Sequence, residues 1–162
     1  DVSGQVAQRR VPTGKFLAGD FLTMPLPPAS FDIVVTMETI GNVLDHQRFI
    51  DRIAELLKPG GHLVLSAQNK FVFERREDVG PPEPGLIRKW VDRPELREIT
   101  ARDFRIVFLT TKMPAGHKGI LRYTNSYRLN QIVSKLGLAG AFDSLREKFG
   151  LGQSIIMLAR RR

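Results

Sequence analysis

The chain has 162 residues, of which 42% are hydrophobic and 26% charged, a composition typical of a globular domain with one core. It contains no cysteine, which excludes disulfides and thiolate metal sites, and no apolar run of about 18 residues that could cross a bilayer. Its first residues also lack the basic and then apolar pattern of a signal peptide. These observations predict a cytoplasmic protein with no membrane partner, and they leave the oligomeric state open.

The net charge of +8 is distributed unevenly along the chain. Residues 1–85 carry 9 Lys and Arg against 11 Asp and Glu, whereas residues 86–162 carry 16 against 6. A basic half can attract nucleic acid, an anionic membrane surface or an acidic substrate. A solvated surface that keeps the protein in solution explains the same charge, and the sequence does not separate these readings.

The first predicted elements are short helices and strands separated by loops that are rich in proline or glycine. Residues 4–10 are typical of a short helix, and residues 14–20 are typical of a short strand that ends at Asp20. Three prolines within 21–30 forbid regular structure and predict a loop. Residues 31–37, "FDIVVTM", are β-branched and continuously apolar, which predicts a strand buried on both faces.

A helix and a strand follow with short connections. Asp45 is a good N-cap for a helix over residues 46–57, whose apolar residues fall on one helical face. The sequence "KPGG" at residues 58–61 stops that helix, and residues 62–67 form the next apolar strand. A strand, a helix and a strand in this order predict an α/β fold with a parallel sheet and crossover helices.

The second half is less regular and begins after "EDVGPPEPG" (residues 77–85), a linker-like stretch with three prolines. The periodicity then predicts helices over 93–104, 127–138 and 143–152 and strands over 105–111 and 153–162.

Taken together, "GDFLTMPLPPASFDIVVTMETIGNVLDHQRFIDRIAELLKPGGHLVLS" (residues 19–66) resembles the class I S-adenosylmethionine-dependent methyltransferases. The resemblance extends over residues 1–66 and returns more weakly in the second half. It implies a Rossmann-like sheet with crossover helices that lacks the first strand–helix–strand unit. It also implies a single, partial domain over 1–162, with a lid or substrate cover at 69–92 and a helical insertion at 113–150.

The resemblance implies S-adenosylmethionine as cofactor, bound across the carboxyl ends of the parallel strands. The implied cofactor-binding residues are Asp1 for the ribose, Val2, Asp20 and Phe21 for the adenine, and Thr36 and Met37 beside the methionine arm. Three of these residues also have a simpler interpretation. Asp1 can be a solvated chain end, Asp20 can cap a turn, and Met37 can belong to the core.

Candidates for a general base follow from the same comparison. Many small-molecule members carry a histidine shortly after the position of Glu38, where this chain has Asn42, and an amide is no base near neutral pH. The candidates are therefore His117, His46 and Glu38, unless proximity alone drives the transfer. Asn42 is also a weak candidate for contacting substrate.

Two further residues are weak substrate candidates. Asn69 begins the expected lid, and Arg122 follows His117 in a polar loop, "PAGHKGILRYTNS". A surface loop with incidental polar residues is the simpler interpretation of that segment.

The function expected is transfer of a methyl group to an O, N or C atom of a small molecule. A first alternative is an RNA or DNA methyltransferase that uses the basic half, although no "DPPY"-type tetrapeptide follows residues 31–37. The sequence is also compatible with a nicotinamide-dependent oxidoreductase and with a catalytically degenerate Rossmann-like binding module.

One feature expected of the family is missing from the sequence. If Asp1 is the ribose ligand, a glycine-rich turn belongs about 20 residues before it, yet no G-x-G-x-x-G occurs in the chain. We therefore expect the sequence to be a truncated form of a longer protein. By itself it should be inactive and bind the cofactor weakly.

Overall fold

The structure is a computed structural model that describes residues 2–116 and 118–162. Asp1 and His117, both singled out above, lie outside the described residues. The helices and strands are, in chain order, α1 Val2–Arg10, β1 Phe31–Met37, the 3-10 turn η1 Ile40–Asn42, α2 His46–Leu56, β2 Leu57–Gln68, α3 Lys70–Phe73, α4 Arg93–Thr100, β3 Phe104–Pro114, α5 Ile120–Thr124, α6 Tyr127–Lys135, α7 Ala139–Lys148 and β4 Gly152–Arg161.

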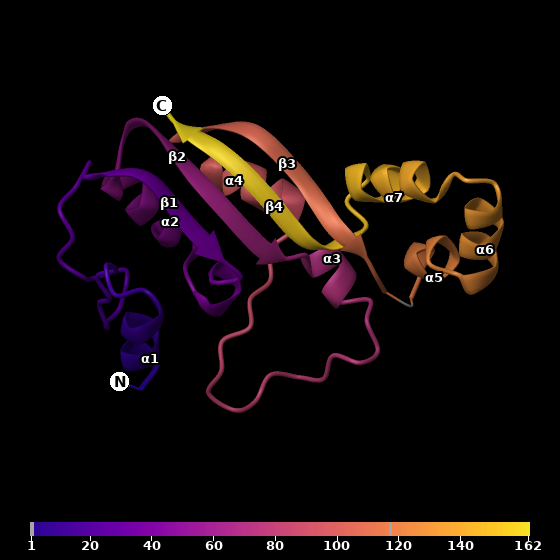
Figure 1. The fold of residues 1–162 in the computed structure, drawn as a ribbon, viewed down its shortest axis with the longest axis horizontal. Helices are drawn as coiled ribbons and strands as arrows, with labels where there is room; N and C mark the ends of the chain where they lie inside the picture. The colour runs from indigo at the N-terminus through magenta and orange to yellow at the C-terminus, as the bar shows by residue number, and fades with distance from the viewer. Residues whose placement is uncertain (1, 117) are drawn as a thin grey trace.

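The four strands form one sheet in the order β1-β2-β4-β3. β1 and β2 are parallel, as the sequence predicts, and β4 is antiparallel to both of its neighbours. Figure 1 shows α2 and α4 together on one face of the sheet, while α5 to α7 gather beyond one end of β3 and β4. Because β3 and β2 both run antiparallel to β4, the carboxyl ends of β1, β2 and β3 point the same way.

The hydrophobic core lies between the sheet and the pair α2 and α4. Alternate residues of β2 and β4 face the helices, as the two-residue period of a strand requires. The largest contributors are Leu63, Leu65, Ile155, Met157, Phe49, Ile50, Ile53 and Leu96, all almost fully buried.

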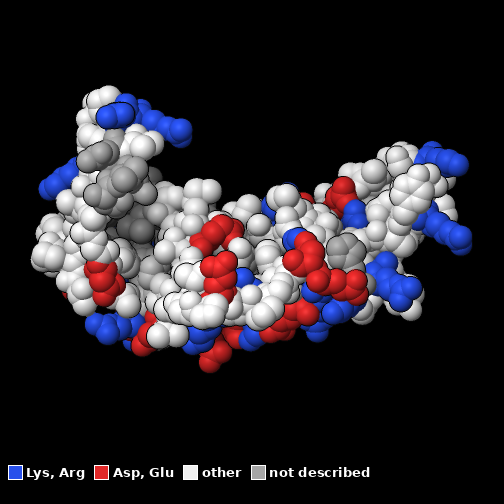
Figure 2. Space-filling model, turned by 90° about the horizontal axis from the view of Figure 1, so that it is seen from below, with Lys and Arg blue, Asp and Glu red and all other residues white. Residues whose placement is uncertain are grey.

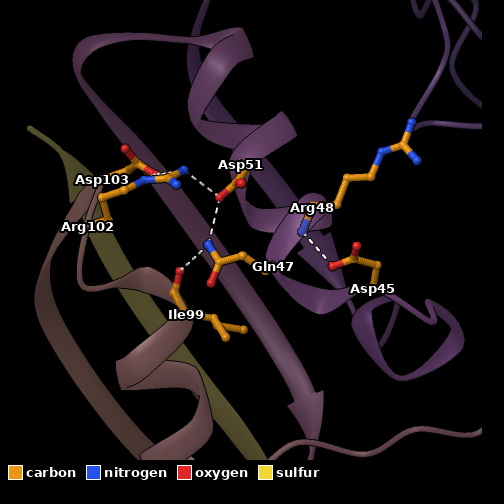
Figure 3. A network of polar contacts seen from close by, with 7 residues as sticks. All are labelled: Asp45, Gln47, Arg48, Asp51, Ile99, Arg102 and Asp103. Atoms are coloured by element: carbon orange, nitrogen blue, oxygen red, sulfur yellow. Dashed lines mark hydrogen bonds and ion pairs between the residues drawn. The ribbon is translucent and has the colours of Figure 1, made fainter.

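Polar contacts fix how α2 lies against α4 (Figure 3). The Asp45 side chain accepts a hydrogen bond from the backbone of Arg48 at 2.9 Å, so it caps the helix as predicted. The Gln47 side chain donates to the Asp51 carboxylate at 2.7 Å, and Arg102 donates to the same carboxylate oxygen at 2.7 Å. The Gln47 side chain also donates to the carbonyl of Ile99 in α4 at 3.2 Å. The Asp45 cap sets where α2 begins and thus the position of His46.

The opposite face of the sheet is not covered by any described element. The register aligns Val35, Val64, Leu158 and Phe108 in one apolar row across the four strands. Val35 is 60% exposed and Phe108 51% exposed. The prediction that β1 is buried on both faces is therefore wrong for the described chain, because helices pack on one face only and one edge of β1 pairs with no described strand.

Residues 14–20 form no strand, which corrects another prediction. A strand forms only where its backbone groups pair with a neighbour, and this segment lies along no described strand edge. Its apolar side chains Phe16 and Leu17 are exposed. The segment has the apolar pattern of a strand, but no described strand lies beside it to pair with its backbone.

Several boundaries also differ from the prediction. β2 begins at Leu57 and not at residue 62, because Leu57 already pairs with Phe31 of β1. The residues around Pro59 and Gly60 form an irregularity within this pairing. α4 ends at Thr100, and three residues separate it from the start of β3 at Phe104. No described helix is long and apolar enough to cross a membrane.

Candidate active site at the carboxyl ends of the strands

Glu38 stands where β1 ends and has a strained backbone. Its φ of +54° lies in the left-handed region, which a residue with a side chain rarely adopts. The backbone N–H of Glu38 donates to the carbonyl oxygen of Ser66 at 2.9 Å and to its hydroxyl at 3.2 Å. One carboxylate oxygen of Glu38 is buried and has no hydrogen-bond partner among the described residues. A buried oxygen of this kind is suited to accept hydrogen bonds from a ligand.

The two residues before Glu38 point to opposite faces of β1. Thr36 is buried, and its hydroxyl also lacks a partner among the described residues. Met37 is 73% exposed, so it is not part of the core in the described chain. Thr36, Met37 and Glu38 lie at the carboxyl end of β1, and their contact with the cofactor stays a prediction.

Asp20 and Phe21 lie in a turn that packs on α2. The Asp20 carboxylate accepts a hydrogen bond from the backbone of Leu22 at 3.0 Å and one from the hydroxyl of Thr23 at 3.3 Å. These are the contacts of a turn-capping residue. The Phe21 ring packs against Phe49, with ring centroids 5.4 Å apart.

A pocket of about 620 Å³ is lined in part by Trp90, which donates a hydrogen bond to Gln68 at the end of β2. Its wall combines His46, the first residue of α2, with side chains from α3, α4, the loop of residues 74–92, and Lys118. The segment 69–92, expected to be a lid, therefore supplies much of the lining of this pocket.

His46, in this wall, has a pKa below its ordinary value. Burial lowers the pKa of His46 from its ordinary value of 6.5, the charge of Lys89 lowers it further, and the charge of Glu95 acts in the opposite direction. Its Nε2 atom is buried and has no hydrogen-bond partner among the described residues. The ring is therefore neutral at pH 7 and can accept a proton.

Two aromatic side chains form another part of the wall. The rings of Phe73 and Trp90 pack with centroids 5.1 Å apart. The Trp90 indole N–H donates to the side chain of Gln68, the last residue of β2, at 2.6 Å. This bond ties the indole to the end of the parallel strands.

Lys89 fastens the same loop to the chain that follows β1. Its backbone N–H donates to the carbonyl of Gly41, and its ammonium donates to the carbonyl of Leu44, both at 2.8 Å. Sequence reasoning did not single out Lys89 or Trp90. The available signal was that Trp90 is the only tryptophan of the chain and lies in the expected lid.

Asn69 occupies a structural position. It is 2% exposed, and its amide donates to the carbonyls of Gly150 and Gly152 at 2.8 and 2.7 Å. Its side-chain oxygen accepts from the backbone of Phe71 at 3.2 Å. Because these groups already bind the protein, we do not carry a substrate role for Asn69 further.

The remaining substrate candidates lie apart from each other. Asn42 is exposed and lies in η1, close in sequence to Glu38. Arg122 is exposed on α5 and lines a different cavity, of about 430 Å³, with residues such as Tyr123. Lys118, from the same polar loop as Arg122, reaches the pocket of His46 instead.

No group of His, Asp and Glu among residues 2–116 and 118–162 has an arrangement that could hold a metal ion.

Comparison with known proteins finds a family match over the part of the chain that contains β1 and Glu38. Residues 2–65 match a family model described as "Methyltransferase domain". A "probable S-adenosylmethionine-dependent methyltransferase" of Mycolicibacterium smegmatis is 31% identical over 56% of this chain and 34% of its own length. Norajmaline N-methyltransferase of Rauvolfia serpentina is 31% identical over 62% of this chain and 34% of its own. The chain thus spans about a third of the length of these curated relatives.

Solved structures show the same fold at low sequence identity. An S-adenosylmethionine-dependent methyltransferase from Mesorhizobium loti superimposes with a TM-score of 0.61 and 18% identity, covering 99% of this chain and 78% of the other. One from Thermotoga maritima gives a TM-score of 0.62 and 17% identity, covering 98% and 69%. S-adenosylmethionine is the methyl donor that these relatives are named for. Residues 2–65 are therefore similar to a methyltransferase domain, and the chain as a whole shares the fold of class I S-adenosylmethionine-dependent methyltransferases.

Proposed function

We propose that the chain is part of an S-adenosylmethionine-dependent methyltransferase that acts on a small molecule, and that it contributes residues to both the cofactor side and the acceptor side. The observation that carries the proposal is Glu38, a strained residue with a buried, unpartnered carboxylate oxygen at the carboxyl end of β1. Strain and an unsatisfied buried oxygen at the same residue are typical of a ligand site.

The residues present fit the cofactor. S-adenosylmethionine carries an ammonium and ribose hydroxyls, which are hydrogen-bond donors that a carboxylate and a hydroxyl oxygen can accept. Thr36 and Glu38 both offer an unpartnered buried oxygen at the strand end, and Met37 is exposed beside them. When bound, the cofactor supplies a methyl group that is already activated on a sulfonium.

The acceptor side needs a surface that orients the nucleophile and a group that can take its proton. The pocket of 620 Å³ is large enough for a small molecule. His46, neutral at pH 7, lines that pocket and is the base that we assign, in preference to Glu38. Alignment of the acceptor in this pocket provides the rest of the rate enhancement. Small-molecule acceptors are also named for relatives, such as ubiquinone biosynthesis O-methyltransferase of Photorhabdus laumondii, 28% identical over 59% of this chain and 48% of its own length.

One observation favours the alternative of a nucleic-acid substrate. A cavity of about 310 Å³ is lined by Gly60, Arg105, Arg160, Arg161 and Arg162. Clustered arginines attract phosphates. This cluster lies at the amino end of β2, where Arg160 pairs with His62, whereas Glu38 contacts Ser66 at the other end. The separation favours the small-molecule proposal.

The test is transfer of a labelled methyl group by the natural full-length protein to fractions of a cell extract. Label in the small-molecule fraction supports the proposal, and label in RNA or DNA supports the alternative. Glu38→Gln should lower the affinity for S-adenosylhomocysteine about tenfold, because a charge-assisted hydrogen bond is lost. Glu98→Gln, on the exposed side of α4, is the matched control. Absence of transfer to every fraction would favour a binding module without catalysis.

A further inference from the structure

Five cationic side chains line the pocket beside His46. They are Lys70, Arg76, Arg88, Lys89 and Lys118. Two of them are neutralised: Lys70 pairs with Glu95 at 2.7 Å, and Arg76 pairs with Asp78. Burial raises the pKa of Glu95, but the hydrogen bonds from Lys70 and from the backbone of Asp92, together with the nearby positive charge, hold the pKa below its ordinary value.

The other three cations, Arg88, Lys89 and Lys118, are not paired with a carboxylate among the described residues. Arg88 donates to the carbonyl of Gly80, and Lys89 donates to the carbonyl of Leu44. A carbonyl oxygen satisfies a donor but does not neutralise a cation. Among the residues that the structure describes, Arg88, Lys89 and Lys118 have no carboxylate within ion-pair distance.

The carboxylates of the wall do not cancel this charge. Glu95 is engaged on both oxygens, by Lys70 and by the backbone N–H of Asp92 at 2.9 Å. Glu74 is the other acidic residue of the lining, and it is exposed. Figure 2, seen from the side of the loop, shows acidic side chains over the middle of this face with Lys and Arg beside them. The pocket therefore has an excess of positive charge without being uniformly basic.

The cations adjoin flat aromatic surfaces. The Arg88 guanidinium lies 5.5 Å from the centre of the Trp90 ring, and the Arg76 guanidinium lies 5.2 Å from that of Phe73. Both rings are half-buried, and their packing against each other leaves a fixed apolar surface next to charged groups.

We propose that this pocket binds an acceptor that is planar and carries an anionic group, a carboxylate or a phosphate. The inference rests on the proposed function, because it assigns the chemical class of the acceptor. Phe73 and Trp90 hold the planar part, and Arg88 and Lys118 attract the anion. Arg88, Lys89 and Lys118 are exposed cations without a carboxylate partner among the described residues, and such cations attract an anionic ligand more strongly than its neutral counterpart.

The experiment is a fluorescence titration of the natural full-length protein with matched probes. The anionic probes are 4-hydroxybenzoate and phenyl phosphate, and the neutral counterparts are 4-hydroxybenzamide and phenol. Quenching of Trp90 reports binding in this pocket, and Trp90→Phe identifies which part of the signal belongs to that residue. We expect at least one anionic probe to bind about tenfold more tightly than its neutral counterpart, with an affinity that falls as salt is added.

Variants test whether these cations cause the preference. The double variant Arg88→Gln, Lys118→Gln should reduce the preference to less than about threefold. The double variant Arg128→Gln, Lys135→Gln removes the same charge from exposed positions of α6 and should leave it unchanged. If the double variant Arg88→Gln, Lys118→Gln does not fold, the salt dependence of probe binding to the unaltered protein still tests whether the pocket prefers anions.

The outcomes separate this inference from the proposed function. Equal affinity for anionic and neutral probes, or no dependence on salt, overturns the inference. A separate calorimetric titration with S-adenosylhomocysteine tests the proposed function. If S-adenosylhomocysteine does not bind but the quenching is selective for anions, the pocket binds anions and the proposed methyl transfer is wrong. Preference for phenyl phosphate over 4-hydroxybenzoate, or the reverse, identifies which anion the acceptor carries.

Discussion

The backbone N–H of Glu38 donates to both the carbonyl oxygen and the side-chain hydroxyl of Ser66, at 2.9 and 3.2 Å. This pair of bonds joins the end of β1 to β2 and holds Glu38 at a φ of +54°. The strained conformation therefore depends on a contact between two adjacent strands. It aims the Glu38 carboxylate inward, where one of its oxygens lacks a partner among the described residues.

Ser66→Ala removes one of these bonds and should weaken cofactor binding more than it weakens the fold. We expect a loss of about 1 kcal/mol in the free energy of unfolding and a several-fold loss of affinity for S-adenosylhomocysteine. Denaturant unfolding and calorimetry measure the two effects. Ser154→Ala, on the same face of β4, is the control and should change neither. Unchanged affinity in Ser66→Ala would mean that Glu38 keeps its position without the hydroxyl.

His46→Gln should alter the dependence of the reaction rate on pH. The folded pKa of His46 lies below 6.5, so the neutral ring is the main form above that pKa and is lost as the pH falls through it. If His46 is the base, the rate falls on the acid side of pH 6.5, and His46→Gln abolishes this decline while lowering kcat about 100-fold or more. His62→Gln, on β2, should keep the normal profile. A normal profile in His46→Gln would eliminate it as the base.

The same shift predicts how stability depends on pH. Because the folded pKa is lowered, the folded state binds fewer protons than the unfolded state once the pH falls below 6.5. The contribution of neutral His46 is present above 6.5 and is lost as the pH falls towards the folded pKa. His46→Gln should therefore lose less stability than the unaltered protein between neutral and mildly acidic pH, as measured by thermal unfolding. A parallel loss in both proteins would contradict the shift.

The elements that depend on local chemistry were predictable from the sequence. Asp45 caps α2 as expected, and the apolar face of α2, with Phe49 and Ile53, is buried in the core. β1 and β2 pair in parallel because a helix connects them. Each of these features is determined by residues that are close together in the sequence.

The parts that depend on distant partners were not predictable. Residues 14–20 have the composition of a strand and lack a neighbour to pair with. Asn69 was a weak substrate candidate, because its two carbonyl partners, Gly150 and Gly152, are about eighty residues away and the sequence does not show them. The role of Trp90 in the pocket depends on its bond to Gln68 at the end of β2. Spacing along the chain contains no information on these contacts.

Asn69→Ala should reduce stability and leave acceptor affinity unchanged in the fraction that remains folded. It removes the donors for two buried carbonyls, and an unsatisfied buried group costs about 1–3 kcal/mol. The comparison is Asn42→Ala, an exposed substitution that should change stability by less than about 0.5 kcal/mol. Denaturant unfolding measures both. A small effect of Asn69→Ala on stability together with a raised KM would restore the substrate role.

The uncovered face of the sheet predicts the behaviour of the 162-residue chain expressed alone. Ile33, Val35 and Met37 are all more than half exposed on an edge strand, a surface that promotes association. We expect the isolated chain to bind an apolar dye and to self-associate, and Val35→Lys to reduce both. Light scattering and dye fluorescence measure the two effects. A monodisperse chain that does not bind the dye would show that this face needs no cover.

The most direct test of the central claim is the thermal unfolding of the natural full-length protein in the presence of different ligands. A ligand that binds only the folded state stabilises it by about 2.7 kcal/mol at a concentration one hundred times its Kd. We expect S-adenosylhomocysteine to raise the Tm by several degrees, NAD to leave it unchanged, and Glu38→Gln to reduce the rise. A rise with NAD and none with S-adenosylhomocysteine would contradict that claim.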